Sequence, residues 1–130
     1  MKLVLDVENT TNTRGGKLHL DPYERGNKLV QVGFQDADNE EFIHLITLDH
    51  VERKDNSGAN RKFIQGVLDE TSLMIMHNAQ HDLMWLWECG FKYDGDIYDT
   101  MLAEYVLLRG QKLPLSLDAC TDRRKLPHLK

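Results

Sequence analysis

The chain is poor in cysteine, and this shortage excludes a disulfide-stapled or zinc-stapled domain. Its 130 residues include only two cysteines, Cys89 and Cys120. Neither lies in a C-x-x-C pair or near a histidine at the spacing of zinc ligands. We therefore expect two reduced thiols, which is typical of a protein of the cytoplasm.

Long apolar runs are also absent, which argues against a membrane protein. Purely apolar runs such as Leu73–Met76 and Leu83–Trp87 have only four and five residues, whereas a helix that crosses a bilayer needs about 20 residues. Asp6 and Glu8 interrupt the N-terminal apolar stretch, so this stretch does not have the form of a secretory signal. The sequence predicts a soluble protein with no membrane partner.

Positive charge is the third shortage. The chain has 16 Lys and Arg against 21 Asp and Glu, and its formal net charge is −5. This balance argues against a protein held on nucleic acid by bulk positive charge alone. It is compatible with an enzyme that meets phosphates through bound cations, because the cations reverse the local sign of the field.

The spacing of apolar and turn residues predicts a strand, a β-hairpin, and then alternating helices and strands. Strands are expected at residues 2–7, 28–34, 41–46, 73–76 and 96–98, with a brief strand at 17–20. Helices are expected at residues 60–69, 79–89, 100–108 and 117–124. Their expected N-caps are Asn60, Asp99 and Ser116. The order predicts an α/β fold, with a mixed sheet and a β-hairpin flanked by helices.

The middle helix, 79–89, is expected to turn Leu83, Leu86 and Trp87 toward the core, and Gly90 to end it. Residues 55–58 are expected to form a loop with capping residues. The whole chain, 1–130, is expected to be a single domain. Because no closing element follows residue 125, we expect this domain to be incomplete at its C-terminal end.

Carboxylates from two distant segments form the candidate site. Asp6 and Glu8 end the first strand and, being two residues apart, point to the same face. Asn78 and Asp82 are four residues apart at the start of a helix and share a face of it. Three acids brought together would suit Mg²⁺ or Mn²⁺. Two such ions, about 3.5–4 Å apart, are the usual apparatus for cutting phosphodiesters.

Each of these residues also has a simpler interpretation. Asp6 and Glu8 could be a solvated strand end, and Asn78 with Asp82 could be an N-cap followed by a favourable first-turn acid. A zinc pair at His77 and His81 lacks the glutamate that zinc proteases place beside the first histidine. The basic C-terminal residues could be a solvated surface or a nucleic-acid contact: Arg109, Lys112, Arg123, Arg124 and Lys125.

Two segments resemble the first two motifs of the DEDD (DnaQ-like) 3′-5′ exonucleases. These are Leu3–Thr10 (LVLDVENT) and His77–Asp82 (HNAQHD). Tyr98–Leu107 and Leu115–Cys120 are similar to the segments that follow in the proofreading domain of family A DNA polymerases. The resemblance runs from residue 2 to about 126. The first motif begins at the first methionine, as in phage polymerases, which favours a phage source and hence the host cytoplasm.

The resemblance implies an RNase H-like fold and two-metal hydrolysis of the 3′ end of single-stranded DNA, releasing nucleoside monophosphates. Asp6, Glu8 and Asp82 would be the catalytic residues and the ligands of Mg²⁺ or Mn²⁺, two ions when the site is complete. The resemblance also implies that Asn9, Asn78 and His81 surround the terminal nucleotide. It implies a structural role for Asp99 as a helix cap.

The chain departs from this family in one respect. The family has a fourth acid, preceded four residues earlier by Tyr or His, and no Tyr or His here is followed by Asp at that spacing. We therefore expect a domain truncated or split before its last motif, weak or inactive alone, whose partner is the remaining polymerase segment or chain. Two alternatives stay open: an inactive RNase H-like module for assembly or nucleic-acid binding, and an RNase D-like ribonuclease. The sequence does not separate DNA from RNA.

Overall fold

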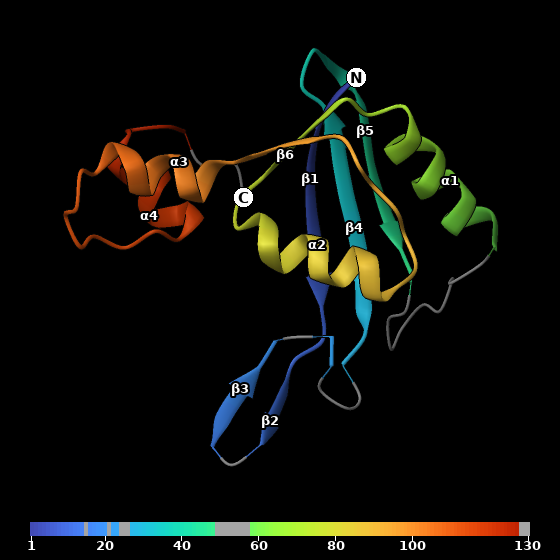
Figure 1. The fold of residues 1–130 in the computed structure, drawn as a ribbon, viewed down its shortest axis with the longest axis horizontal. Helices are drawn as coiled ribbons and strands as arrows, with labels where there is room; N and C mark the ends of the chain where they lie inside the picture. Colours follow the sequence, from blue (N-terminus) through green and yellow to red (C-terminus); the bar gives the residue numbers. More distant parts are fainter. Residues whose placement is uncertain (15, 21, 24–26, 49–57, 128–130) are drawn as a thin grey trace.

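The computed structural model describes residues 1–14, 16–20, 22–23, 27–48 and 58–127 (Figure 1). Its strands are β1 (Lys2–Asn9), β2 (Asn12–Arg14), β3 (Lys17–His19), β4 (Leu29–Asp36), β5 (Asn39–Thr47), β6 (Leu73–Met76) and β7 (Asp96–Asp99). Its helices are α1 (Gly58–Asp69), α2 (Ala79–Glu88), α3 (Thr100–Leu107) and α4 (Leu117–Arg123). In these ranges, none of the helices combines the length and the apolar character that crossing a membrane requires.

Five strands form one mixed sheet in the order β5-β4-β1-β6-β7. The hairpin of β4 and β5 pairs antiparallel with β1, while β6 and β7 run parallel to β1. The parallel strands are joined through helices, as parallel pairing requires a crossover. The predicted α/β fold, a mixed sheet with a β-hairpin flanked by helices, is confirmed.

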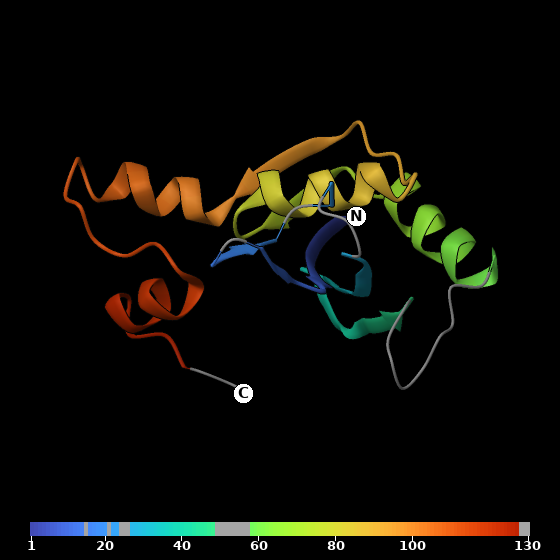
Figure 2. The ribbon, with the colours of Figure 1, turned by 90° about the horizontal axis from the view of Figure 1, so that it is seen from below.

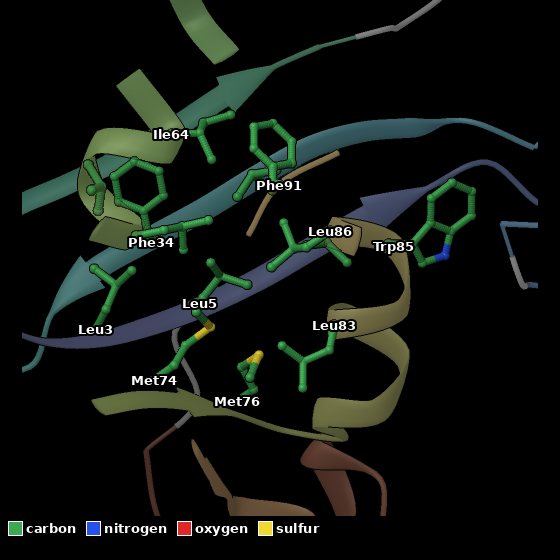
Figure 3. Packing of buried hydrophobic residues seen from close by; sticks show 14 of the residues in the cluster. Leu3, Leu5, Phe34, Ile64, Met74, Met76, Leu83, Trp85, Leu86 and Phe91 are labelled. Carbon is green, nitrogen blue, oxygen red and sulfur yellow. The ribbon is translucent and has the colours of Figure 1, made fainter. Parts of the chain in front are cut away.

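One face of the sheet carries the hydrophobic core. Along β1, Leu3, Leu5 and Val7 are buried while the residues between them are exposed, as the two-residue period of a strand dictates. Side chains of α1 and α2 complete the same cluster, among them Ile64 and Leu86 (Figure 3). Both helices therefore cover one face of the sheet and pack on β1 from that side (Figure 2).

The opposite face of the sheet is open in the described part of the chain. Val4, Ile43 and Leu45 point to it and keep 43%, 63% and 65% of their surface exposed. Gly33 lies between β1 and β5 on this face, where it pairs with Asp6 on one side and with Leu45 on the other. These residues line a groove of about 340 Å³. A glycine inside a strand often marks a place where another backbone or a ligand approaches closely.

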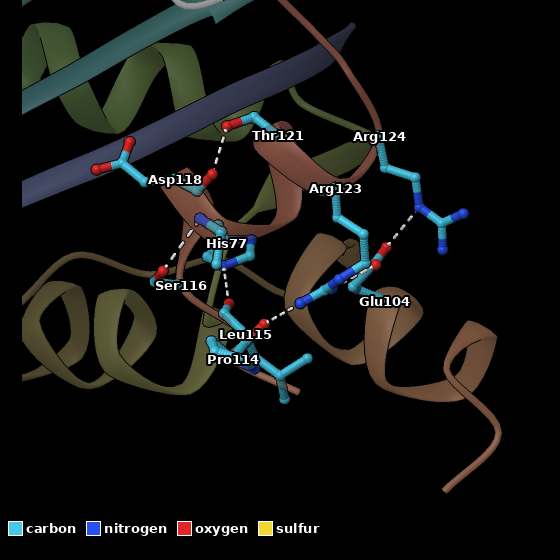
Figure 4. Close-up of polar contacts among 10 residues, drawn as sticks. His77, Glu104, Pro114, Leu115, Ser116, Asp118, Thr121, Arg123 and Arg124 are labelled. Atoms are coloured by element: carbon cyan, nitrogen blue, oxygen red, sulfur yellow. Dashed lines mark hydrogen bonds and ion pairs between the residues drawn. The ribbon is translucent and has the colours of Figure 1, made fainter. Parts of the chain in front are cut away.

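Helices α3 and α4 lie beside the sheet and are joined by a buried carboxylate (Figures 1 and 4). Glu104 of α3 is paired with Arg123 at 2.8 Å and with Arg124 at 3.1 Å. Hydrogen bonds from these two guanidinium groups hold the pKa of Glu104 below its ordinary value. Arg123 and Arg124, two of the five basic C-terminal residues, therefore bind Glu104 of the same chain.

We expect Glu104→Gln to loosen α4 from α3, because the amide cannot balance two guanidinium charges. Amide hydrogen exchange over α4 at pH 7 measures this loosening. Because the pKa of Glu104 is lowered, the wild-type protein keeps the contact above the ordinary pKa and loses it only in acid below that value. Equal exchange rates in the variant and the wild-type protein at pH 7 would contradict this role.

Two local expectations are corrected by the structure, and a third is confirmed with a strand partner that was not expected. Asn60 lies inside α1, which begins two residues earlier, at Gly58, so it is not the N-cap. Trp85 is the buried tryptophan, whereas Trp87 is 58% exposed. The brief strand at residues 17–20 is β3, and it pairs with β2, which no sequence signal indicated. Of the expected loop at 55–58, residues 55–57 lie outside the described residues.

Candidate active site

β1 places Asp6 and Glu8 on the open face of the sheet. They alternate with the buried Leu5 and Val7, so both residues lie on the side away from the core and keep part of their surface exposed. Burial raises the pKa of Asp6, while the backbone N–H of Val7 and then the nearby His81 and His77 oppose this rise. The predicted shared face is confirmed.

Asp82 lies in the first turn of α2, and only 2% of its surface is exposed. Burial, followed by the negative charges of Asp6, Glu8 and Asp99, raises its pKa to about 8. One of its oxygens, Oδ2, is buried and has no hydrogen-bond partner within the described structure. The three predicted acids therefore form one electrostatic cluster, built from a strand and from the start of a helix.

The donor set of this cluster fits a hard divalent cation. An unpartnered buried carboxylate oxygen is costly, and a cation beside it would remove that cost. Over the described ranges, no three side chains of the His, Cys, Asp and Glu types are grouped tightly enough to enclose an ion by themselves. Separate carboxylates that leave positions for water and phosphate are how Mg²⁺ is usually held.

Asn9 and His81, both expected near the terminal nucleotide, are in direct contact. His81 Nε2 lies 3.0 Å from Asn9 Oδ1, and because that oxygen can only accept, Nε2 carries the proton. The Asn9 amide group donates to the carbonyl oxygens of Thr10 at 2.7 Å and Leu20 at 3.1 Å. The Leu20 carbonyl also accepts a hydrogen bond from Trp85 Nε1 at 3.0 Å. This network ties the acids on β1 to α2 and to the segment that follows β3.

Asn78 precedes α2 in a left-handed conformation, with φ 67° and ψ 64°. It holds the N-cap position, but its side chain makes no capping hydrogen bond. The interpretation of Asn78 as a side-chain cap is therefore wrong, although Asn78 does occupy the N-cap position. The side chain of Asn78 is not tied to the helix that it begins.

Asp99 supplies the missing cap. It caps its own helix, as predicted, by accepting hydrogen bonds from the backbone N–H groups of Met101 and Leu102. It also accepts from the backbone N–H groups of Asn78 and Ala79, both at 3.0 Å. Burial opposes the ionisation of Asp99, but these four donors outweigh it and lower its pKa. The bonds to α2 were missed, because no sequence signal indicates a cap taken from another strand.

The zinc interpretation of His77 and His81 finds no support in the described residues. Both ring nitrogens of His77 have protein partners. Nδ1 lies 2.9 Å from Thr100 Oγ1. Nε2 lies 2.7 Å from the Leu115 carbonyl oxygen, a contact drawn in Figure 4. His81 is bonded to Asn9 through Nε2. His77 thus joins the end of β6 to the segments around α3 and α4.

Comparisons with known proteins bear on the family and the fold of the chain. A family model described as 3′-5′ exonuclease matches residues 19–123, which include Asp82 and His81 but begin after Asp6 and Glu8. The solved structure of Brucella melitensis NrnC with bound Mg²⁺ is similar in fold, with a TM-score of 0.65 and 15% sequence identity. The match covers 98% of this chain and 55% of that chain. No curated protein matches the chain.

Proposed function

The chain belongs to the 3′-5′ exonuclease family, and on this premise we propose that it removes nucleotides from the 3′ end of single-stranded DNA at a site built from Asp6, Glu8 and Asp82. The observation that carries the proposal is the buried, unpartnered Oδ2 of Asp82 beside two further carboxylates. Such a group is unstable as an anion until a cation joins it. The proposed products are nucleoside monophosphates.

Asp6, Glu8 and Asp82 would hold Mg²⁺ or Mn²⁺, two ions when the site is complete. A bound cation of this kind activates a water molecule and neutralises charge on the phosphate. The bound Mg²⁺ of the similarly folded NrnC structure supports the choice of cation. The role of this chain would be to hold three carboxylates in fixed positions: Asp6 and Glu8 on β1, and Asp82 on α2.

The polar residues next to the acids would hold the terminal nucleotide. Asn9 already uses both ends of its amide, so it acts as a brace for the His81 ring. The N–H at Nε2 of His81 donates a hydrogen bond to Asn9, and no hydrogen bond in the described structure engages Nδ1. Nδ1 is therefore the ring atom that we propose for binding the substrate. Asn78, which is exposed at the start of α2, is the third proposed contact.

We propose further that a segment or chain outside this sequence supplies a fourth acid and covers the open sheet face. Two observations support this partner. Val4, Ile43 and Leu45 are exposed on the face that also carries Asp6, and the chain spans only 55% of the length of its structural neighbour. The resemblance of Tyr98–Leu107 supports a family A DNA polymerase as our proposed context. We also propose a phage source and, with it, the host cytoplasm.

The test is degradation of 3′-labelled single strands in Mg²⁺, by the isolated chain and by the chain mixed with the product of the next open reading frame. We expect slow or no cleavage by the chain alone and clear cleavage by the mixture. Asp6→Ala should lower the activity of the mixture more than about 100-fold, since even the partners of metal ligands contribute 10–100-fold. Asp38→Ala, at the exposed turn after β4, should change it little.

Each other outcome would contradict a different part of this proposal. An inactive mixture, or full activity in Asp6→Ala, would contradict the proposed enzyme and favour a module for assembly or nucleic-acid binding. Rapid cleavage by the pure chain would contradict the need for a partner. Running DNA and RNA strands of the same sequence side by side tests the substrate, and a preference for RNA would favour a ribonuclease.

A further inference from the structure

We propose that Asp99 is a positioning residue for the exonuclease site, on whose proposed function this inference rests. Its carboxylate would fix the first turn of α2, and through that turn the places of His81 and Asp82. It would do so from β7, without being a ligand of the cation. The role follows from four hydrogen bonds and from one unusual backbone conformation.

The register of the sheet brings Asp99 to the start of α2. Strands β6 and β7 run parallel, with Met76 paired to Asp99, so both strands end at the same level. Asp99 Oδ1 accepts from the N–H of Asn78 at 3.0 Å, and Oδ2 accepts from the N–H of Ala79 at 3.0 Å. Oδ1 also accepts from Met101 N–H at 2.9 Å. One carboxylate therefore receives the positive ends of two helices.

The start of α2 depends on this outside cap. The first N–H groups of a helix have no partner within it, and a side chain at the N-cap usually supplies one. Asn78 supplies none, and its backbone is left-handed, a conformation that is uncommon for residues other than glycine, although asparagine adopts it more readily than most. At a functional site, such a conformation is usually held in place by its surroundings. The hydrogen bonds from the N–H groups of Asn78 and Ala79 to Asp99 hold Asn78 in this conformation.

The consequence falls on the residues of the first turn. His81 N–H bonds to the Asn78 carbonyl oxygen at 3.2 Å, so a shift of Asn78 moves the turn that carries His81 and Asp82. Asp82 is almost fully buried, and a metal or catalytic constellation tolerates displacements of only about 0.5 Å. Loss of Asp99 would therefore weaken cation binding by moving Asp82, although the hydrogen bonds of Asp99 in the described structure come from backbone N–H groups of Asn78, Ala79, Met101 and Leu102.

The test compares Asp99→Ala and Asp99→Asn with Ser116→Ala, in the whole chain. Ser116 is the N-cap of α4, where its side chain accepts from Ala119 N–H at 3.2 Å, so its loss reproduces the loss of a cap away from the acids. Mn²⁺ alone is the probe, with its dissociation constant read from the electron paramagnetic resonance of the free ion. Circular dichroism and melting temperatures establish that each variant is folded.

We expect Asp99→Ala to weaken Mn²⁺ binding about 10-fold or more, as is typical for partners that orient metal ligands. Ser116→Ala should stay within about twofold of the wild-type protein in its Mn²⁺ affinity and should lower the melting temperature less than Asp99→Ala does, since it loses the cap of one helix where Asp99→Ala loses the caps of two. Asp99→Asn keeps a carbonyl oxygen as acceptor and should bind with intermediate affinity, which keeps the comparison valid if Asp99→Ala does not fold.

The outcomes separate the two claims. If the wild-type protein does not bind Mn²⁺, the proposed function falls and the role of Asp99 falls with it. If the wild-type protein binds and both Asp99 variants bind equally well, only the role of Asp99 is overturned. The same holds if Ser116→Ala weakens binding as much as Asp99→Ala, because the effect would then reflect general loss of stability.

Discussion

Replacing Asp82 with asparagine should make the metal-free protein more stable at pH 8 and insensitive to divalent cations. The folded chain holds the Asp82 proton up to a pKa of about 8, whereas the unfolded chain releases it near the ordinary value of 3.8. Between these values the folded state binds more protons, so the free energy of unfolding falls as pH rises. At about 1.4 kcal/mol per pKa unit, the loss from pH 4 to pH 8 reaches about 5 kcal/mol. Asparagine stays neutral and avoids it.

The measurement is urea unfolding from pH 4 to pH 8, with EDTA and with Mg²⁺. Wild-type and Asp82→Asn proteins should be similar at pH 4 and diverge as pH rises, while Mg²⁺ should restore stability to the wild-type protein alone. Asp38→Asn, an exposed acid in the turn after β4, is the matched control and should behave as the wild-type protein. If the free energy of unfolding depends on pH in the same way in the wild-type protein and in Asp82→Asn, the ionisation of Asp82 is not the cause of the lost stability.

The second large effect is expected at Trp85. Only 2% of its surface is exposed, within the core between α2 and the sheet. Truncation of a buried aromatic side chain to alanine leaves a cavity and costs about 3–5 kcal/mol. Because Trp85 Nε1 also donates to the Leu20 carbonyl oxygen, Trp85→Ala should free the segment after β3 as well. Chemical unfolding gives the first effect, and hydrogen exchange around Leu20 gives the second.

Two further variants separate the effects at Trp85. Trp87→Ala removes the same side chain from a position that is 58% exposed, so it should change the free energy of unfolding by less than about 0.5 kcal/mol. Trp85→Phe keeps most of the core packing and removes the hydrogen bond, so its effect should be strongest at Leu20. If Trp87→Ala proved as destabilising as Trp85→Ala, the assignment of the core face of α2 would be wrong.

The sheet could be predicted because its signals are local. Asp6 and Glu8 alternate with Leu5 and Val7 in β1, and this alternation fixes both the strand and the face of its acids. Helix α2 was harder, because its apolar residues run without interruption from Leu83 to Trp87. Helical spacing alone therefore assigned Trp87 to the core, whereas packing against the sheet selects Trp85.

The site could be predicted as a set of acids, but the arrangement that supports them could not. The bonds from Asn78 and Ala79 to Asp99 depend on the register of β6 against β7, and no residue pattern encodes that register. The bond between Asn9 and His81 likewise joins positions 72 apart in the sequence. Such contacts are properties of the assembled sheet, which is why a capping interpretation of Asn78 failed while that of Asp99 succeeded.

The parallel pairing of β1 with β6 also sets the order of events during synthesis. Leu3 pairs with Met74 and Val4 with Ile75. β1 can therefore pair with β6 only after the ribosome has made this much later strand. Pairings this distant in sequence form slowly, because a long loop must close before they contribute. Asp6 and Glu8 therefore leave the ribosome well before Asp82 can join them. A nascent chain stopped before α2 therefore carries two of the three proposed cation ligands and lacks the proposed site.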